Sequence, residues 1–290
     1  MRSRLVDEFV TAARSAEDNL PLCALLMARV AYPDLDPQPC LALLERMGAT
    51  ARDHLEIGVG GEPPRRTRLR VVTEFVYGQL GFTGNAEHYE DPRNSLLNDV
   101  IARRTGIPIT LALVFIAVAR RAGLDVEGVN FPGHFLVRCN PDAADRRDRD
   151  PLLLDPFHGG ATLNDVECAR LLKRHLGEDA VPGPELLRRA SKDDVLMRML
   201  LNLKRAYVRL RSFGRAHAVT DLVVALDPAA LTELRDRGLL ASQMRDYAAA
   251  LRDLETWLQL SPATGDEAGE DRTQVWDHVK DLRRRLASLN

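Results

Sequence analysis

Two residues near the middle of the chain, His134 and Asp155, have the types and the surroundings needed for proton transfer. His134 stands in the segment PGHFLVRC, directly after the turn FPG, and Asp155 ends the apolar run of the segment LLLDPFHGG. If these two segments pair as an antiparallel hairpin, their side chains lie side by side at one edge of a sheet. A carboxylate in that position orients an imidazole, which then acts as a general base toward a nucleophile.

The elements that must position this pair are one apolar helix and three short strands. The segment 108–122 is apolar on nearly every face and predicts a buried central helix. Three short strands are expected to follow it, as DVEGVNF, HFLVRC and PLLLDPF, with the charged loop NPDAADRRDRDP between the last two. Apolar residues at helical spacing predict further helices before residue 56, over 67–80 and from Asp91 onward. The pattern predicts an α+β class with a core over residues 91–160.

A second region begins after the segment EDAVPGPEL and contains an internal repeat. The segment FGRAHAVTDLVVALDP (213–228) recurs as YAAALRDLETWLQLSP (247–262), 34 residues later. An aromatic residue, a small residue and a closing proline return at this period, which is typical of tetratricopeptide helix pairs. We therefore predict two parts: residues 1–182, with N-terminal helices and the core, and residues 183–290, with all-α helical repeats.

The composition of the chain limits which partners it can bind and in which compartment it is expected. The chain has 290 residues, of which 45% are hydrophobic and 28% are charged, and its formal net charge is −2. This balance gives no electrostatic basis for binding nucleic acid or an anionic membrane. The N-terminal stretch carries acidic residues and the longest apolar run contains a proline, so neither a targeting peptide nor a membrane span is expected. We expect a cytoplasmic protein.

Motifs for metals and cofactors are absent from the sequence. The four cysteines form no CxxC pair and have no histidine at ligand spacing; they are Cys23, Cys40, Cys139 and Cys168. No Gly-rich phosphate loop, His-Glu-x-x-His pair or acidic metal cluster occurs either. We expect buried, reduced thiols, no metal site and no cofactor.

Three segments carry a resemblance to a known family: NSLLNDVIARRTGIPITLALVF, GVNFPGHFLVRC and LLLDPFHGG. They resemble the SirB-type, transglutaminase-like family of bacterial proteins, whose pattern joins such a core to a tetratricopeptide tail. The tail is present here as well, so the resemblance extends over most of the chain. It implies a papain-like transglutaminase fold.

The resemblance also implies a place for a nucleophile. In such sequences a cysteine begins the buried helix, where the helix dipole and a nearby imidazole stabilise its thiolate. Counting from Gly106 places Pro108 at that position. Thr110 is the nearest hydroxyl and a weak candidate, because a threonine there more often bonds to the helix backbone than attacks a carbonyl. Cys139 lies five residues after His134 on the same predicted strand, so the two side chains are expected on opposite faces.

Other residues near the pair are candidates for a binding cleft. Asn94 and Asn98 lie one turn apart on the predicted helix before the central one, where they either cap helices or line the cleft. His158, in the turn FHGG, is a candidate to face the same cleft. Ile107 and Phe131 are expected to line it as well.

Three functions remain open at this stage. The first hypothesis is a non-catalytic protein that binds a protein or peptide partner through a degenerate cleft and the helical repeats. The second is a hydrolase or an amide or acyl transferase that uses His134 and Asp155 with Thr110 or an activated water. In the third, the repeats alone carry the function and the core only supports them. The sequence favours the first, because a proline occupies the nucleophile's position.

Overall fold

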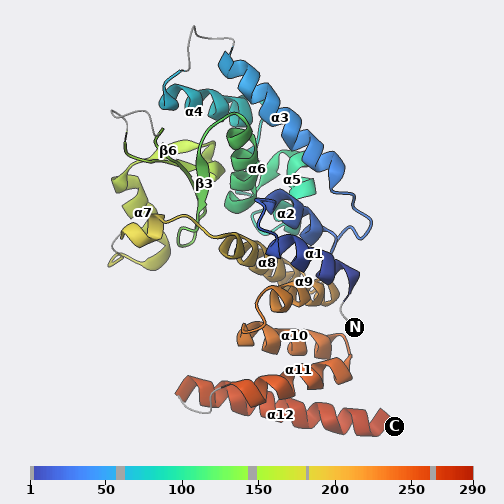
Figure 1. The fold of residues 1–290 in the computed structure, drawn as a ribbon. Coiled ribbons are helices and arrows are strands. Elements are labelled where there is room, and N and C mark those ends of the chain that lie inside the picture. The colour runs from blue at the N-terminus through green and yellow to red at the C-terminus, as the bar shows by residue number, and fades with distance from the viewer. Residues whose placement is uncertain (1–2, 57–62, 143–148, 181–182, 262–265, 290) are drawn as a thin grey trace. The chain divides into compact units, whose positions relative to one another are not determined.

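The structure is a computed structural model in which residues 3–56, 63–142, 149–180, 183–261 and 266–289 are described (Figure 1). It divides into two compact units, Ser15–Met199 and a second unit made of Met1–Arg14 with Leu200–Asn290. The division falls within one helix, α8 (Lys192–Arg209). The predicted parts, 1–182 and 183–290, differ from these units because the first helix belongs with the C-terminal helices.

The first unit is built around the predicted central helix, α6 (Pro108–Arg121). Every residue of this helix from Pro108 to Ala119 is buried, as its uniformly apolar sequence requires. The helices that precede α6 in this unit are α2 (Leu20–Ala28), α3 (Gln38–Glu56), α4 (Arg65–Thr73) and α5 (Leu97–Arg103). The helices α2, α3, α4 and α5 all contact α6, and α3 makes the most extensive of these contacts.

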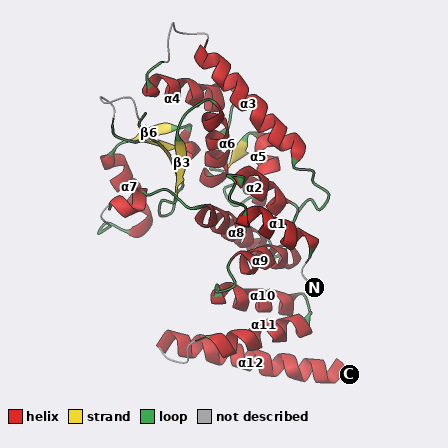
Figure 2. Cartoon of the chain, viewed as in Figure 1, coloured by secondary structure: helices red, strands yellow, loops and turns green. Residues whose placement is uncertain are grey.

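A four-stranded antiparallel sheet contacts α6 as well, and Figure 2 shows its strands among the helices. Its strands lie in chain order: β3 (Val126–Val129), β4 (Leu136–Cys139), β5 (Leu152–Asp155) and β6 (Ala161–Leu163). Strands β4 and β5 form the predicted hairpin, with Val137 opposite Leu154 and Cys139 opposite Leu152. After β6 comes α7 (Asp165–Leu176), whose start is closed by reciprocal bonds between Asn164 and Glu167. The predicted α+β class is confirmed.

Two short elements differ from the sequence-based expectation. The helix expected over 67–80 is α-helical only to Thr73 and continues as a π-helical turn, Glu74–Gln79. The helix expected from Asp91 is a 3₁₀ turn followed by the short α5, because the Asp91 carboxylate accepts a bond from the Arg93 amide and closes a separate turn. A parallel pair of two-residue strands, β1 (Thr83–Gly84) and β2 (Thr105–Gly106), was not predicted.

The second unit is all-helical and contains the predicted repeat. Its helices beyond α8 are α1 (Arg4–Arg14), α9 (Phe213–Leu226), α10 (Leu231–Gln243), α11 (Tyr247–Leu260) and α12 (Asp266–Leu289). The helices α9 and α11 begin and end 34 residues apart, in agreement with the sequence period. Their small residues, Ala216 and Ala250, are completely buried and allow the neighbouring helices to approach closely.

A close approach between α10 and α11 makes Gly238 sensitive to substitution. A Cβ at Gly238 would lie 2.7 Å from Leu254 Cγ and 3.2 Å from Asp253 Cβ, both on α11. We expect Gly238→Ala to destabilise this unit by about 1–3 kcal/mol, because the helices must separate to admit the methyl group. Urea denaturation followed by circular dichroism measures this change.

Gly214→Ala provides the matched control, because a Cβ at this helical glycine meets no atom within 4 Å. This variant should be neutral or slightly more stable than the wild type. Equal effects of the two substitutions would contradict the proposed packing of α10 against α11.

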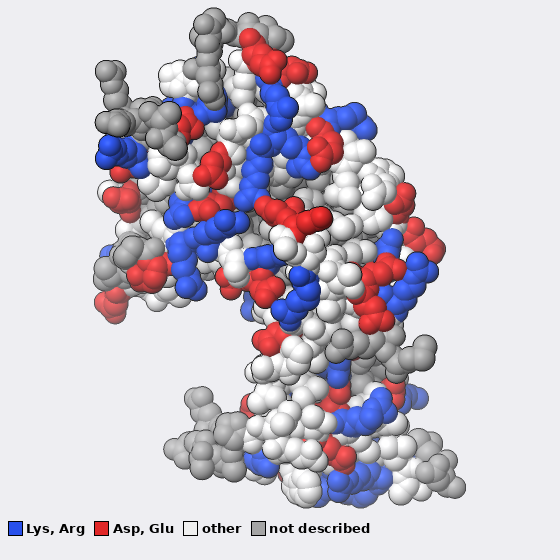
Figure 3. Space-filling view, in the orientation of Figure 1, with Lys and Arg blue, Asp and Glu red and all other residues white. Residues whose placement is uncertain are grey.

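Charged side chains of both signs are intermixed on the face of the molecule drawn in Figure 3. No helix among the described residues is both long enough and apolar enough to cross a membrane.

Candidate functional site

The structure brings His134 and Asp155 together at one end of the β4–β5 hairpin. Asp155 is the last residue of β5, and His134 lies two residues before β4 begins. His134 Nε2 lies 2.8 Å from Asp155 Oδ1, and both residues are buried. The charged loop of the hairpin leaves from the opposite end, so the pair depends on the hairpin register and not on the loop.

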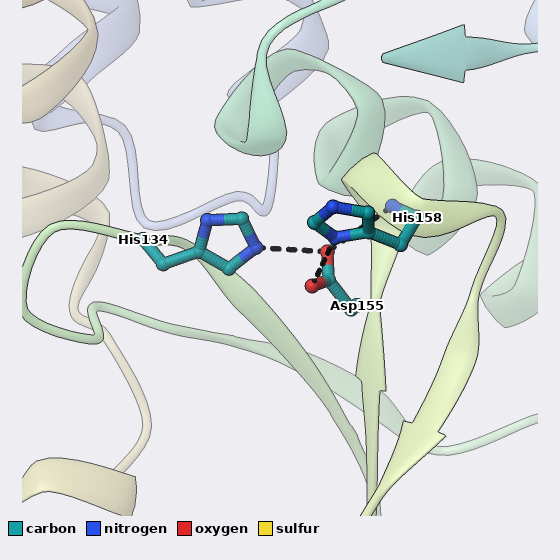
Figure 4. Close-up of side chains that lie close together, drawn as sticks. All are labelled: His134, Asp155 and His158. Carbon is teal, nitrogen blue, oxygen red and sulfur yellow. Dashed lines mark hydrogen bonds and ion pairs between the residues drawn. The ribbon is translucent and has the colours of Figure 1, made fainter. Parts of the chain in front are cut away.

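The Asp155 carboxylate makes four polar contacts, and Figure 4 shows those with the two imidazole rings. In addition to His134, its Oδ1 accepts bonds from the Phe157 amide at 2.9 Å and the His158 amide at 3.3 Å. Its Oδ2 lies 2.7 Å from His158 Nδ1. Burial works to raise the pKa of Asp155, but the bonds and charges of His134 and His158 outweigh it and hold that pKa below its usual range. The carboxylate is therefore ionised at neutral pH.

His158 is the solvent-facing member of this cluster. Its side chain is 59% exposed, whereas those of His134 and Asp155 are 8% and 5% exposed. It is held by the 3₁₀ turn Pro156–His158, which Gly159 and Gly160 end with positive φ angles. From the sequence, His158 was predicted only as a possible cleft residue. Its direct contact with the Asp155 carboxylate results from this turn.

Thr110 is fully buried and its hydroxyl is already engaged. The hydroxyl lies 2.7 Å from the Asn94 carbonyl and 3.1 Å from the Ile107 carbonyl, and it accepts a bond from the Ile107 amide at 3.2 Å. These contacts close the start of α6 and tie it to the preceding turn. They argue against the expectation that Thr110 attacks a substrate and favour a structural role.

We expect Thr110→Val to lower the free energy of unfolding by about 1–3 kcal/mol, because it removes the hydroxyl and leaves the buried Ile107 amide and nearby carbonyls less satisfied. Thr110→Ser keeps the hydroxyl and should cost only about 1 kcal/mol for the lost methyl group. Chemical denaturation distinguishes the two variants. A serine variant as unstable as the valine variant would show that the methyl group, not the hydroxyl, matters.

Three residues expected at a small cleft beside the start of α6 are buried in the structure. Pro108 is the first residue of α6 and is buried, and Ile107, which precedes the helix, is 3% exposed. Phe131 is completely buried in a cluster with residues of β3, β4 and α7. Ile107 and Phe131 therefore offer almost no surface to an external ligand, and their expected place at the cleft stays a prediction.

Asn94 is a structural residue of the neighbouring loop. Its amide nitrogen donates to the His88 carbonyl at 2.7 Å and its Oδ1 accepts from Asn85 Nδ2 at 3.1 Å. Asn94 thus fixes the loop before it, including Tyr89, which the sequence did not single out. Asn98 is half-buried on α5, and its Oδ1 has no hydrogen-bond partner among the described residues.

The family of the chain follows from its sequence similarity. Residues 38–201 match the transglutaminase-like superfamily, and residues 203–277 match the tetratricopeptide repeat. The chain belongs to the transglutaminase-like superfamily. The predicted resemblance to the SirB-type family with a tetratricopeptide tail is confirmed.

Relatives of this transglutaminase-like protein occur in bacteria and in animals. A UPF0162 protein of Xylella fastidiosa (strain Temecula1) is 38% identical over 253 residues, which cover 86% of each chain. A UPF0162 protein of Vibrio cholerae is 29% identical over 221 residues, which cover 76% of this chain and 79% of the relative. The F-box only protein 21 of Homo sapiens is 39% identical over 110 residues, but these cover 37% of this chain and 18% of the relative.

Aromatic residues surround the cluster in the transglutaminase-like core. Phe157 packs edge to face on His134 and on Tyr89, with ring centroids 6.3 Å and 5.8 Å apart. Tyr89 is 45% exposed, so it and His158 are the parts of this group that a ligand can reach. Neither Tyr89 nor Phe157 follows a sequence pattern that indicates a site.

Tyr77, on the π-helical turn, lies close enough to feel the charge of Asp155. Burial, and then this negative charge, raise its pKa well above the usual value, so its hydroxyl stays protonated. Its ring stacks on Phe115 of α6, with ring centroids 5.7 Å apart. A Cβ at Gly160 would lie 2.6 Å from the Tyr77 ring, so this position requires glycine both for space and for its φ of +71°. π-helical turns often occur at functional sites.

The four cysteines of the chain do not supply the missing nucleophile. Burial raises the pKa of Cys23 and of Cys139 to about 11, and it raises the pKa of Cys40 and of Cys168 as well. Three of them are buried, and Cys40 is half-buried. At neutral pH all four are thiols rather than thiolates, which are the reactive form.

We expect the native protein at pH 8 to react with a thiol reagent such as DTNB at no more than one cysteine, Cys40, because the other three are neutral and buried. All four should react after unfolding in guanidinium. Absorbance of the released chromophore counts the modified thiols. A second thiol that reacts rapidly in the native state would indicate an activated cysteine and would contradict this assignment.

Proposed function

We propose that this transglutaminase-like protein is a pseudoenzyme that binds a protein partner through its helical repeats. The observation that carries the proposal is Pro108, which is buried at the first turn of α6, where the resemblance puts the nucleophile. A proline offers neither a nucleophilic atom nor a backbone amide to stabilise an oxyanion. The hydrogen-bonded hydroxyl of Thr110 and the neutral state of the cysteines support the same conclusion.

The repeat region supports the binding half of the proposal. Residues 203–277 match the tetratricopeptide repeat, and stacked helix pairs of this kind present extended surfaces to other proteins. Trp276 on α12 and Met244 after α10 are large apolar side chains that are 46% and 45% exposed. Aromatic residues and methionine are enriched at interfaces between proteins.

The core supplies a second, smaller contact in this proposal. Tyr89 and His158 offer an exposed aromatic ring and an exposed imidazole beside the buried carboxylate. An extended segment of the partner's chain would lie against these two side chains, because a ring and a hydrogen-bonding group together suit a peptide.

Photo-cross-linking tests which surface the partner uses. A photoreactive residue replaces Trp276 in one variant and His158 in another. A third variant carries it in place of Val166, an exposed residue of α7, as a control. Cross-linked proteins are identified by mass spectrometry. We expect one protein to be enriched at 276 and the same protein, more weakly, at 158. Enrichment at 158 with none at 276 would contradict a role of the repeats, and equal labelling at 166 would show that the capture is nonspecific.

A second function, a hydrolase or an amide or acyl transferase, is favoured by one observation. His134 and the ionised Asp155 retain the 2.8 Å contact of a base with its orienting carboxylate, and such a pair is able to activate a water. Purified protein is assayed with ester, amide and glutaminyl peptide substrates beside His134→Ala. Turnover by the wild type that this variant loses would establish the enzyme and overturn the pseudoenzyme.

A further inference from the structure

We propose that His134, Asp155 and His158 form a binding site for a transition-metal dication, with Zn²⁺ the ion that best fits the donor set. Each residue offers one ligand atom, and these three atoms lie within 4.8 Å of one another. They are two imidazole nitrogens and one carboxylate oxygen (Figure 4). His134 lies just before β4, Asp155 ends β5, and His158 ends the 3₁₀ turn that follows. This site shares His158 with the smaller peptide contact proposed above, but it does not depend on the helical repeats.

The donor types match the chemistry of zinc. Zn²⁺ binds histidine nitrogen and carboxylate oxygen at about 2.0–2.2 Å, and a site with three protein ligands leaves a fourth position for water or another ligand. Two donors bonded to one such ion are about 3 Å apart or slightly more. His134 Nε2 and His158 Nδ1 already lie 2.8 Å and 2.7 Å from the two carboxylate oxygens. Since the three ligand atoms lie within 4.8 Å of one another, an ion requires only small movements of the two rings.

The protons of the cluster also balance. Without metal, each imidazole donates one N–H to the carboxylate, because an ionised carboxylate only accepts hydrogen bonds. On coordination, the same nitrogen gives up its proton and binds the ion through its lone pair, and the ring keeps one proton on its other nitrogen, with any excess proton released to solvent. Asp155 is already ionised, so it binds without losing a proton.

The environment holds Asp155 in position and provides an entry path. Its Oδ1 accepts bonds from the amides of Phe157 and His158, which orient the carboxylate as outer-shell partners do in metal sites. His134 and Asp155 are buried, whereas His158 is 59% exposed and can swing outward to admit an ion. The fourth coordination position would then face the solvent side, near His158.

The sequence did not indicate this site, because its spacing belongs to no standard metal motif. His134 and Asp155 are 21 residues apart, and the hairpin register alone brings them together. Asp155 and His158 are three residues apart in a 3₁₀ turn, where side chains at this spacing lie on the same side.

Calorimetric titration of the chelator-treated full-length protein with Zn²⁺ tests the proposal. We expect one Zn²⁺ per chain and a higher melting temperature in its presence, because the ion binds the folded state. His158→Ala should weaken Zn²⁺ binding at least about tenfold, since outer-shell losses alone cost that much. This variant should fold normally because the replaced side chain is exposed, and circular dichroism verifies this.

His217→Ala is the matched control. His217 Nδ1 lies 3.5 Å from Asp221 Oδ2, a histidine–aspartate pair on α9 that has no place in the three-residue cluster. Zn²⁺ affinity should be unchanged in this variant. In a second measurement, Co²⁺ bound to the wild type should show the visible absorption of a low-coordinate site, and His158→Ala should lose this absorption. Absence of Zn²⁺ binding, or equal binding by the wild type and His158→Ala, would overturn the proposal and leave the cluster as a hydrogen-bonded hub.

Discussion

Replacing Asp155 with alanine is expected to lower the free energy of unfolding of the first unit by about 3–5 kcal/mol, the range for removal of one partner from a buried charged pair. The loss follows because His134, the Phe157 amide and the His158 amide all depend on this carboxylate. Urea denaturation in the presence of a chelator measures the intrinsic effect. His158→Ala is the comparison, and it should cost less than about 1 kcal/mol because its contact is exposed.

The stabilisation by Asp155 should also depend on pH. Its pKa is held below the usual range in the folded state, so it contributes stability above the pKa of the unfolded carboxyl, about 3.9. The advantage of the wild type over Asp155→Asn should be complete at pH 7 and should disappear as the pH falls through the lowered pKa. A difference between the two proteins that does not change down to the acid transition would contradict this account.

Phe115→Ala is expected to destabilise the first unit by about 3–5 kcal/mol, because it removes a large buried side chain of α6 and leaves a cavity. Phe115 is 1% exposed and its ring stacks on Tyr77, which in turn lies beside Gly160. Phe115→Leu preserves much of the volume and should cost less than about 1.5 kcal/mol. Denaturation curves of the three proteins give these differences. Similar values for alanine and leucine would mean that stacking on Tyr77, not volume, accounts for the loss.

The parts of the fold with strong periodicity were predictable from the sequence. The central helix, expected over 108–122, runs from Pro108 to Arg121. It was predicted to be buried because a helix that is apolar on nearly every face has to be covered by other elements. The helices α9 and α11 start at the residues where the repeat starts, Phe213 and Tyr247. Packing of small residues against neighbouring helices maintains that period, so it is visible in the sequence.

The parts that depend on single contacts were not predictable. The parallel pair β1–β2 has two residues in each strand, too few for any alternation to appear. The π-helical turn Glu74–Gln79 directly continues α4, and the helical spacing of apolar residues does not change where the π-helical turn begins. In the candidate site, the approach of His134 to Asp155 was anticipated from the hairpin. The second imidazole at the same carboxylate depends on one 3₁₀ turn and on the glycines that end it.

The two ends of the β4–β5 hairpin carry different features, the candidate site at one and the connecting loop at the other. His134 and Asp155 stand at one end, and Cys139 and Leu152 pair at the other, where the connecting loop leaves. Arg65 anchors this far end, donating to the Cys139 carbonyl at 3.3 Å and to the Asp150 carbonyl at 2.7 Å. Extra residues between positions 142 and 149 would therefore lengthen the connection without changing the strand register, and the entropic cost grows only slowly with loop length. The same segment is thus a natural place to graft a fluorescent label or an affinity tag while both histidines remain undisturbed.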